Sequence, residues 1–324
     1  MLALAAGVGA AGVLGACSSP RATQADRIMV PNQPGGGYDA TARAAAKVMA
    51  ATGITPTRMD VFNLPGGSGG TAMSRLAGER CNGHLVLMMG LGLVGALVGL
   101  GRQAELLEAT AVGRLVTEPG VFMVPKDSPI GDLEDLLRRW RRRPGSVRIG
   151  GGSALGGPDH LLPLLLARRV GIDPSAVRFV AHDGGGGLMP SLLEGKVDVG
   201  VSGAGEYLPH IAAGGVRVLA VSGEGASTLA GVNAPTLGAA GYPVDFVNWR
   251  GLLAPPGVGH AELTAWRKRW ERLDSAPEWE ATCASYGWSR AALGEGDFRA
   301  FLSGQVQRVS GLLEEFTVSG RSGA

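Results

Sequence analysis

The stretch Val30-Pro-Asn-Gln-Pro-Gly-Gly-Gly-Tyr-Asp39 decides the fold of this chain, because it joins a predicted strand to a predicted helix through a glycine-rich turn. The residues Arg27-Ile-Met-Val30 predict a short strand ahead of the turn. Asp39 is expected to cap a helix that runs to about Ala51, since small and apolar side chains recur on one face at helical spacing. A strand, a turn and a helix in this order form the building unit of α/β folds.

The same order of strand, glycine-rich turn and helix recurs three more times. The turns are Pro65-Gly-Gly-Ser-Gly-Gly70, Gly150-Gly-Gly-Ser-Ala-Leu-Gly-Gly-Pro-Asp159 and Asp183-Gly-Gly-Gly-Gly187. Each turn places unpaired backbone N–H groups at the positive end of a helix dipole, where an anion can bind. None carries the lysine of a P-loop, which disfavours a nucleotide phosphate. Four such cradles without an evident catalytic group indicate a binding protein, although any one of them is equally explained as a tight connection.

The pattern of strands and helices changes once along the chain. Extended segments between Thr110 and Val124 interrupt the first series of units, and a second series follows them. Phe246–Ala254 is expected to cross back to the first series. This organisation predicts an α/β fold of two lobes joined by two crossing segments, each lobe with a mostly parallel sheet. Ligands in such folds bind between the lobes, at the carboxyl ends of the strands.

The domain boundaries are placed at these changes of pattern. We expect a lipoprotein signal peptide at 1–16, a tether at 17–26, the first part of lobe 1 at 27–120, lobe 2 at 121–247, and the return crossing with the C-terminal helices that complete lobe 1 at 248–324.

The N-terminal segment predicts export from the cytoplasm. Residues 2–16 carry no charge, and they are too few to span a bilayer in a mature protein. Leu14-Gly-Ala-Cys17 resembles the bacterial lipobox, in which the cysteine is diacylated and becomes the new N-terminus. We therefore expect an extracytoplasmic protein with Cys17 as its lipid anchor to the membrane.

Composition narrows the possible partners. The 324 residues, 45% of them hydrophobic, suffice for the cores of two lobes. A formal net charge of +2 argues against nucleic acid as a partner. Five arginines surround Trp140 and are interpreted as a solvated helix end, with a membrane surface or a protein partner as the alternative. They are Arg138, Arg139, Arg141, Arg142 and Arg143. Cys81 and Cys283 either pair or remain two buried thiols.

Gly66-Gly-Ser-Gly-Gly70 matches the G-x-S-x-G pattern of a nucleophilic serine. Ser68 would then need a base, either His160 with Asp159 or His182 with Asp183. Pro65 and two glycines separate Ser68 from the preceding strand, so the sharp turn of a nucleophile elbow is not evident. Ser68 is accordingly interpreted as a hydrogen-bond donor to a ligand or as a turn residue.

Other polar residues are candidates for ligand contacts. The five histidines lack metal-ligand spacing, and we expect neither a metal nor another cofactor. His160 is interpreted as a ligand contact or as a structural histidine at a helix start. Arg250, on the return crossing, either pairs with a ligand carboxylate or braces the hinge. Glu206 is interpreted as a helix-start residue rather than a ligand group.

Several motifs in one order resemble the substrate-binding proteins of tripartite tricarboxylate transporters, the Bug family. The resemblance begins at Val30–Arg43 and covers essentially the whole chain after the signal segment. The further motifs are Asn63–Gly70, Gly150–His160, Asp183–Gly187, Leu193–Asp198, Val216–Val221, Ala234–Thr236 and Trp249–Pro255.

The resemblance implies a type II periplasmic-binding-protein fold, also called a Venus flytrap. It implies capture of a small di- or tricarboxylate, citrate-like by family name, for delivery to a membrane permease with no reaction catalysed. In the family, backbone groups and bridging water from one turn of each lobe hold the carboxylates, here Gly35–Tyr38 and Ser153–Gly157. Together with the residue arguments above, the expected ligand contacts are Gly35, Gly36, Gly37, Tyr38, Ser68, Ser153, Ala154, Gly156, Gly157, His160, Asp183 and Arg250.

Two functions of other classes remain open at this point. One is a serine hydrolase built on Ser68, which a fluorophosphonate probe would label. The other is a surface sensor of carboxylates that kept the fold and signals to a protein partner.

Overall fold

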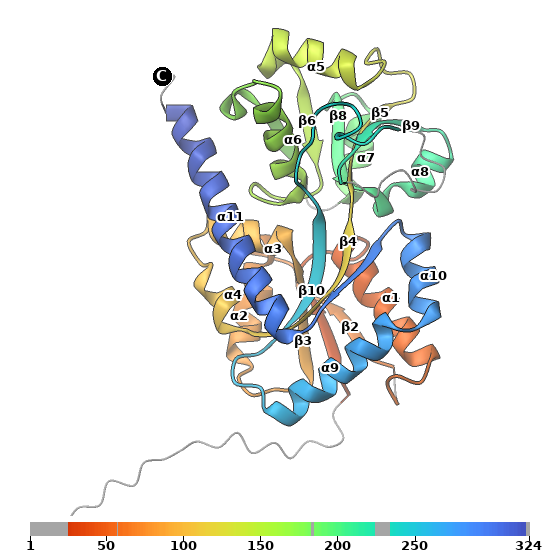
Figure 1. Ribbon diagram of the computed structural model, residues 1–324, viewed down its shortest axis with the longest axis vertical. Coiled ribbons are helices and arrows are strands. Elements are labelled where there is room, and N and C mark those ends of the chain that lie inside the picture. Colours follow the sequence, from red (N-terminus) through yellow and green to blue (C-terminus); the bar gives the residue numbers. More distant parts are fainter. Residues whose placement is uncertain (1–24, 57, 183–184, 224–233, 322–324) are drawn as a thin grey trace, which may run out of the picture.

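The computed structural model describes residues 25–56, 58–182, 185–223 and 234–321. Two α/β lobes are stacked along the long axis of the molecule, and strands β4 and β10 run between them (Figure 1). The two-lobed fold that the sequence predicts is therefore present, but both sheets mix parallel and antiparallel pairs and are not mostly parallel as expected.

The sheet of the first lobe has six strands in the order β11-β4-β10-β3-β1-β2. Its strands are β1 (Arg27–Val30), β2 (Asp60–Asn63), β3 (Leu85–Gly90), β4 (Thr110–Glu118), β10 (Asn248–Ala254) and β11 (Ser289–Leu293). β1 pairs in parallel with β2 and β3, whereas β10 lies antiparallel between β3 and β4. The return strand thus joins the sheet from within and ties the C-terminal part of the chain to the first lobe.

The helices of the first lobe cover both faces of this sheet (Figure 1). They are α1 (Gly37–Ala51), α2 (Gly70–Gly78), α3 (Leu91–Gly99), α4 (Ala104–Glu108), α9 (His260–Asp274), α10 (Pro277–Ser285) and α11 (Glu295–Arg321), and the 3-10 turn η1 spans Gly67–Gly69. Alternate side chains of a strand point to opposite faces. Ile28 of β1 accordingly packs in the cluster that holds Trp266 of α9, and Met29 packs in the cluster that holds Val94 of α3.

The sheet of the second lobe has five strands in the order β7-β6-β8-β5-β9. Its strands are β5 (Gly120–Pro125), β6 (Arg148–Gly151), β7 (Arg178–Ala181), β8 (Val199–Gly203) and β9 (Val216–Val221). The helices are α5 (Leu133–Arg142), α6 (Pro158–Arg169), α7 (Gly185–Leu193) and α8 (Leu208–Ala212), with 3-10 turns η2 (Pro144–Ser146), η3 (Pro174–Ala176) and η4 (Ala204–Glu206).

Three connections join the lobes. The chain changes sheet between Glu118 and Gly120, and again between β9 and β10. The third is α11, which runs beside both lobes in Figure 1 and places Glu315 2.7 Å from Arg168 of α6. Its start is fixed to the return strand, because Phe298 packs edge-on against Trp249 with ring centroids 5.8 Å apart. Trp249 therefore faces this helix and is buried there.

Several local expectations need correction. Gly36, not Asp39, is the N-cap of α1, and Asp39 lies in the first helical turn, where its carboxylate accepts a 3.0 Å hydrogen bond from the Gly35 N–H. Helix α3 and strand β11 were not predicted. Cys283 is a buried free thiol, so it forms no disulfide with Cys81. Within the described ranges, no helix has the length and apolar character needed to cross a bilayer.

Candidate functional site

Two adjacent chambers lie between the lobes, at the carboxyl ends of β1 and β6. The inner chamber has a volume of about 80 Å³ and the outer one about 540 Å³. Both are lined by Tyr38 and Gly92 of the first lobe and by Ser153 of the second. Because strands of the two lobes end here, the position agrees with the rule that α/β folds bind ligands at their strand termini.

The first-lobe turn is held together by Asp39. Its carboxylate accepts hydrogen bonds from the Gly35 N–H, the Arg43 guanidinium and the Asn63 amide, each at 3.0 Å. Desolvation by burial raises the pKa of Asp39, but the hydrogen bonds from Arg43, Gly35 and Asn63 outweigh it and lower that pKa overall. Asp39 is therefore an ionised structural residue, and the Gly35 N–H is committed to it.

The second-lobe turn is held by Asp159 in the same manner. Asp159 lies in the first turn of α6, whose N-cap is Gly157, and its carboxyl accepts a 2.8 Å bond from the Gly152 N–H and a 3.3 Å bond from the Ser202 hydroxyl. Burial, with the negative charges of Glu206 and Glu118 adding to it, raises the pKa of Asp159 to about 8. Asp159 is accordingly neutral at pH 7.

Arg250 lies at the base of the inner chamber, where β4 and β10 meet. One of its guanidinium nitrogens, Nη2, forms a buried ion pair with Glu118, whose other oxygen accepts a 2.7 Å bond from the Gly205 N–H. The side chain of Arg250 is 3% exposed, and its Nη1 has no hydrogen-bond partner in the described part of the chain. A buried donor of this kind is costly unless a ligand or water satisfies it.

Glu206 of the second lobe reaches across the cleft to the first. Its carboxyl accepts a hydrogen bond from the backbone N–H of Gly37, the first residue of α1. Burial and the neighbouring charge of Glu118 raise the pKa of Glu206 to about 7. A carboxylate of the protein itself thus occupies the anion position at the N-terminus of α1.

Five of the predicted contact residues come together in the inner chamber. They are Gly36, Gly37, Tyr38, Ser153 and Arg250. Ser68 and Ala154 line only the outer chamber. Gly35, Gly156, Gly157 and His160 line neither chamber, and Asp183 lies outside the described residues.

His160 is a structural histidine here and not a chamber residue. Its Nδ1 accepts a 3.0 Å bond from the Gly156 N–H, and its ring packs against Phe179 with centroids 4.8 Å apart. Burial lowers the pKa of His160 to about 4, so the ring is neutral at physiological pH. Because the ring turns back onto its own loop, the structure places it away from both chambers, and a ligand contact of His160 stays a prediction.

Tyr38 lines both chambers, and its side chain is held in a fixed position. Its hydroxyl oxygen accepts a 3.0 Å bond from the Leu93 N–H at the start of α3. Burial raises the pKa of Tyr38 to about 12, which keeps the phenol protonated. The unpredicted helix α3 thereby sets the orientation of a residue that the sequence did predict.

Ser68 lacks the surroundings of a nucleophile. It lies in η1 with a left-handed φ of 54°, a conformation that non-glycine residues adopt rarely. Among the described residues, no hydrogen bond joins it to His160 or His182, and the His182 Nδ1 instead lies 3.2 Å from the Gly151 carbonyl oxygen. Its place in the outer chamber suits contact with a ligand.

Several chamber residues were missed by the sequence argument. Glu206 was assigned to a helix start, and Asp159 was considered only as the partner of His160 in a catalytic pair. Asn32, Gly92, Gly152, Pro158, Ser202, Gly203 and Asn248 also line the inner chamber. Asn32 falls inside the first quoted turn, which was a usable signal, whereas Gly92 and Ser202 arrive from elements whose position only the packing determines.

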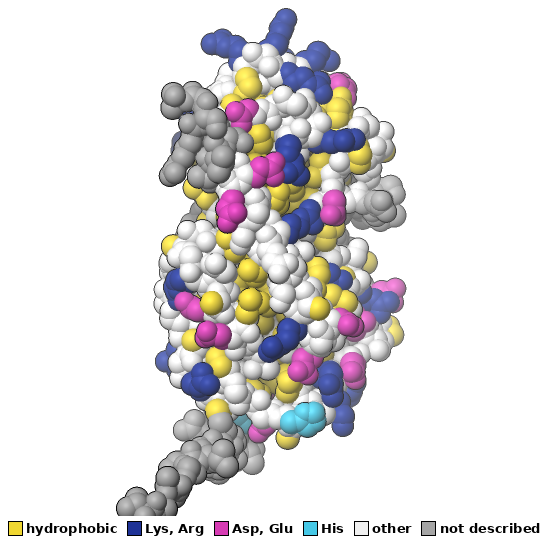
Figure 2. All heavy atoms as spheres, turned by 60° about the vertical axis from the view of Figure 1, so that its left-hand side comes forward, with side chains coloured by type: hydrophobic (Ala, Val, Ile, Leu, Met, Phe, Trp, Pro, Cys, Tyr) yellow, Lys and Arg dark blue, Asp and Glu magenta, His cyan; other side chains and the backbone are white. Residues whose placement is uncertain are grey.

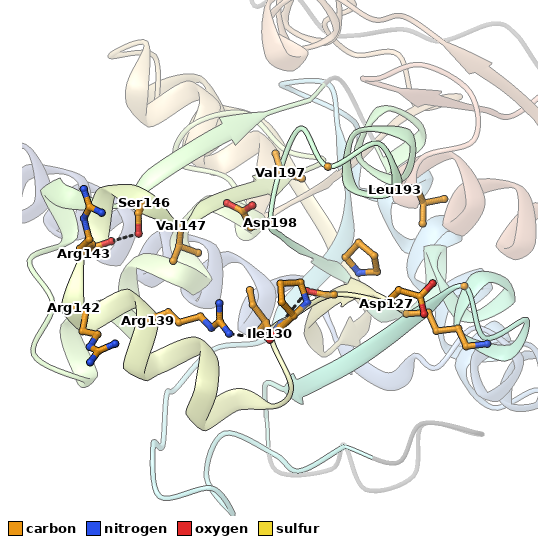
Figure 3. A pocket seen from close by; sticks show the side chains of 16 residues that line it. Asp127, Ile130, Arg139, Arg142, Arg143, Ser146, Val147, Leu193, Val197 and Asp198 are labelled. Atoms are coloured by element: carbon orange, nitrogen blue, oxygen red, sulfur yellow. Dashed lines mark hydrogen bonds between the residues drawn. The ribbon is translucent and has the colours of Figure 1, made fainter.

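A larger cavity of about 670 Å³ lies elsewhere in the second lobe (Figure 3). Val147, which lines it, directly precedes β6, whereas Gly152 of the inner chamber directly follows that strand. The two sites are thus at opposite ends of β6. Arg139 is turned to the wall, where it donates to the Pro129 carbonyl oxygen at 2.9 Å.

The basic helix end beside this cavity is exposed. Figure 2 shows Lys and Arg side chains gathered at the tip of the second lobe, the end at which α5 lies in Figure 1. Arg138 and Arg139 each pair with Asp135 one helical turn away, at 3.1 Å. These pairs agree with the interpretation of a solvated helix end.

Known proteins resemble this chain in sequence and in fold. Protein BugT of Bordetella pertussis is 27% identical over 300 residues, which cover 89% of this chain and 88% of BugT. The structure of R. palustris Rpa4515 with adipate superposes with a TM-score of 0.81 at 21% identity, covering 91% of this chain and 98% of that one. MatC from Rhodopseudomonas palustris with bound malate gives a TM-score of 0.75 at 22% identity, covering 90% and 99%.

These solved structures establish the fold, and their two lobes match the arrangement described above. Proteins of this group are solute-binding receptors and not enzymes, which removes the hydrolase interpretation of Ser68. Residues 104–318 match the tripartite tricarboxylate transporter family receptor. This chain belongs to that family of extracytoplasmic receptors.

Proposed function

We propose that the protein captures a small di- or tricarboxylate between its lobes and delivers it to the permease of a tripartite tricarboxylate transporter. The observation that carries the proposal is Arg250, a buried cation that lines the inner chamber with one unpartnered nitrogen. A guanidinium nitrogen forms strong, charge-assisted hydrogen bonds with carboxylates. The relatives with malate and adipate bound make carboxylates of four to six carbons the first candidates.

The two chambers suit an elongated ligand. The inner one has room for a single head group, and the outer one, lined by Ser68 and Ala154, has room for a chain with a second carboxylate. We retain the division of the chain into residues 27–120 and 248–324 for the first lobe and 121–247 for the second as part of this proposal.

A thermal-shift and calorimetry panel tests the function. It contains malate, succinate, adipate, citrate and their amino and hydroxy derivatives, with chloride and phosphate salts at equal ionic strength as controls. At least one carboxylate should raise the melting temperature and bind at one site per chain. If no member of the panel binds, the protein is not a receptor for carboxylates of this size.

The proposal also assigns Cys17 as the membrane anchor, on the evidence of the lipobox-like Leu14–Cys17. Two acyl chains give stable attachment, whereas one does not. Cys17→Ser, expressed in a bacterial host, should leave the membrane fraction and appear in soluble extracts. If the variant sediments with membranes as completely as the parent, Cys17 is not the anchor.

A further inference from the structure

The inner chamber contains more carboxyl groups than cations. Arg250 is already paired with Glu118, which leaves Glu206 and Asp159 as additional carboxyl groups facing the same space. Within the residues described, neither Glu206 nor Asp159 forms an ion pair with a lysine or arginine. A ligand that brings only carboxylates would be repelled by Glu206 whenever that group is ionised.

The anion position of the first-lobe turn is also taken. The Gly37 N–H, which points along the axis of α1 into the cleft, donates to Glu206. A methyl group built on Gly37 would lie 2.7 Å from the Glu206 Oε1, which shows how closely the side chain covers this turn. A ligand carboxylate can use this N–H only by displacing a carboxylate of the protein.

The unsatisfied atoms of the chamber define what it lacks. Arg250 Nη1 is a donor without an acceptor, and Asn32 Oδ1 is a buried acceptor without a donor in the described part of the structure. Glu206 adds a charged acceptor beside them. A carboxylate satisfies Arg250 but cannot donate to Asn32 or Glu206, whereas an ammonium group carries three donors and a positive charge.

Building on the proposed function, we propose that the inner chamber selects carboxylates that bear an amino group on the neighbouring carbon, and that Glu206 makes this selection. The α-carboxylate binds Arg250 Nη1, and the α-ammonium donates to Glu206 and Asn32. An α-amino acid head group joins these two functions across one carbon, which suits a chamber of about 80 Å³. The remainder of the ligand, with a second carboxylate, extends into the outer chamber.

The selection depends on pH through Glu206. The charges that act on Glu206 are those of Glu118, Asp159 and Arg250. Tyr207 is its neighbour in the chain, and Glu194 and His210 line a separate pocket that Glu206 also borders. Burial, with the charge of Glu118, places its pKa at about 7. At pH 8.5 Glu206 is therefore anionic and attracts an ammonium group, and Asp159, whose pKa is about 8, is largely ionised beside it. At pH 5.5 both acids are neutral and the attraction is lost.

Matched ligands isolate the amino group. Calorimetry at pH 8.5 compares succinate, malate and aspartate, then glutarate with glutamate, and adipate with 2-aminoadipate. We expect the amino member of at least one series to bind about tenfold or more tightly than its unsubstituted partner, because charge-assisted hydrogen bonds are worth about 1.5–3 kcal/mol. The advantage should shrink at pH 5.5.

Glu206→Gln keeps the shape and the acceptor for Gly37 but removes the charge. It should reduce the preference for the amino ligand by about tenfold while the unsubstituted ligand binds as well or better. Glu194→Gln is the control, because Glu194 is exposed, pairs with Lys196 and lines neither of the two chambers. Circular dichroism and melting temperature verify that both variants fold.

The outcomes separate this inference from the proposed function. If succinate, glutarate and adipate each bind as tightly as their amino partners, the inference is overturned while the receptor function stands. A preference that survives in Glu206→Gln also overturns it, because another group must then make the selection. If no ligand of any series binds, it is the receptor function that fails.

Discussion

The two glycine-rich turns of the cleft are built alike, but the aspartate of the first turn is ionised at pH 7 and that of the second is neutral. In each, a glycine is the N-cap of a helix, and an aspartate in the first helical turn accepts a hydrogen bond from a backbone N–H of the turn. Asp39 also contacts Arg43 and Asn63, and its pKa is lowered. Asp159 is buried opposite Glu206, and its pKa is raised to about 8.

The difference lies in the surroundings of the aspartates, not in the motif. Arg43 is half exposed and comes from the same helix as Asp39, so the first turn neutralises its own charge. Among the described residues, the Asp159 carboxyl accepts hydrogen bonds from the Ser202 hydroxyl and the Gly152 N–H alone, and the charges that act on it are negative. One turn thus serves as a stable anchor, and the other presents an uncharged acid to the cleft.

The largest expected effect breaks the first turn at its contact with the second lobe. In Gly37→Val, the added carbons would overlap Arg250 and the Glu206 carboxyl, so the lobes cannot meet around a ligand. The variant should lose the two charge-assisted hydrogen bonds proposed between the ligand and Arg250 and Glu206. Ligand binding, measured by calorimetry, should therefore weaken by about 100-fold or more.

Gly36→Val gives a graded comparison at the neighbouring residue. The φ of Gly36 is −80°, which any residue adopts, and the nearest atom to a methyl group there would be the Asn32 amide nitrogen at 3.0 Å. It should bind more weakly than the parent and more tightly than Gly37→Val, with a melting temperature near the parent's. Equal affinity of all three proteins would mean that this turn does not contact the ligand.

Replacing each aspartate by asparagine tests the charge states directly. Asp39→Asn loses hydrogen bonds made by an ionised group and should lower the free energy of unfolding by about 1–3 kcal/mol at pH 7. Asp159→Asn resembles the neutral acid that is already present and should cost much less. Urea unfolding at pH 7 measures both, and equal losses would contradict the assigned protonation of Asp159.

Closure against α3 is the next smaller effect. The carbonyl oxygen of Gly156, in the second-lobe turn, lies where a methyl group on Gly95 would project. Gly95→Ala should therefore hold the lobes apart and weaken ligand binding by about tenfold. Small-angle scattering should show that a saturating ligand shrinks the radius of gyration of the parent but not of this variant.

Gly99→Ala is the matched control for Gly95→Ala. Gly99 ends the same helix, and a methyl group there would meet nothing within 4 Å. It should close and bind as the parent does. If both variants close normally, the approach of Gly95 to Gly156 does not limit closure.

The smallest effect is a change in pH dependence. Because the folded pKa of Asp159 lies above its unfolded value of 3.8, its contribution to stability is complete below about pH 4 and is lost as pH rises toward 8. Asp159→Asn lacks this loss, so its melting temperature should gain on the parent's between pH 5 and pH 8. Parallel curves over that interval would show that Asp159 titrates near its ordinary value.

The sequence predicted the parts of the fold that are encoded locally. The units around β1 and β6 follow from a short apolar run, a glycine turn and helical spacing, and all three signals lie within about 25 residues. Helix α3 was missed because Leu91–Gly99 is apolar on all sides, with little periodicity to mark it. Strand β11 was missed because it joins the sheet only through pairing with β4, far away in the chain.

The site was predicted where backbone geometry decides it and not where distant side chains meet. Gly36, Gly37, Tyr38, Ser153 and Arg250 were expected in the cleft and line it. The position of Glu206 opposite Gly37 depends on how one lobe rests on the other, which no local pattern contains. The charge state of Asp159 depends on its burial and on Glu206 and Glu118, which lie far from it in the sequence.

Helix α11 has a consequence for how the receptor releases its cargo. It is 27 residues long and reaches from Phe298, packed on the first lobe, to Glu315, which pairs with Arg168 of the second. Both members of that pair are nearly half exposed, so its strength is small, about 0–1 kcal/mol, and falls as ionic strength rises. Dissolved salt should therefore weaken this contact between the lobes, whereas the buried ion pair of Arg250 with Glu118 is screened much less.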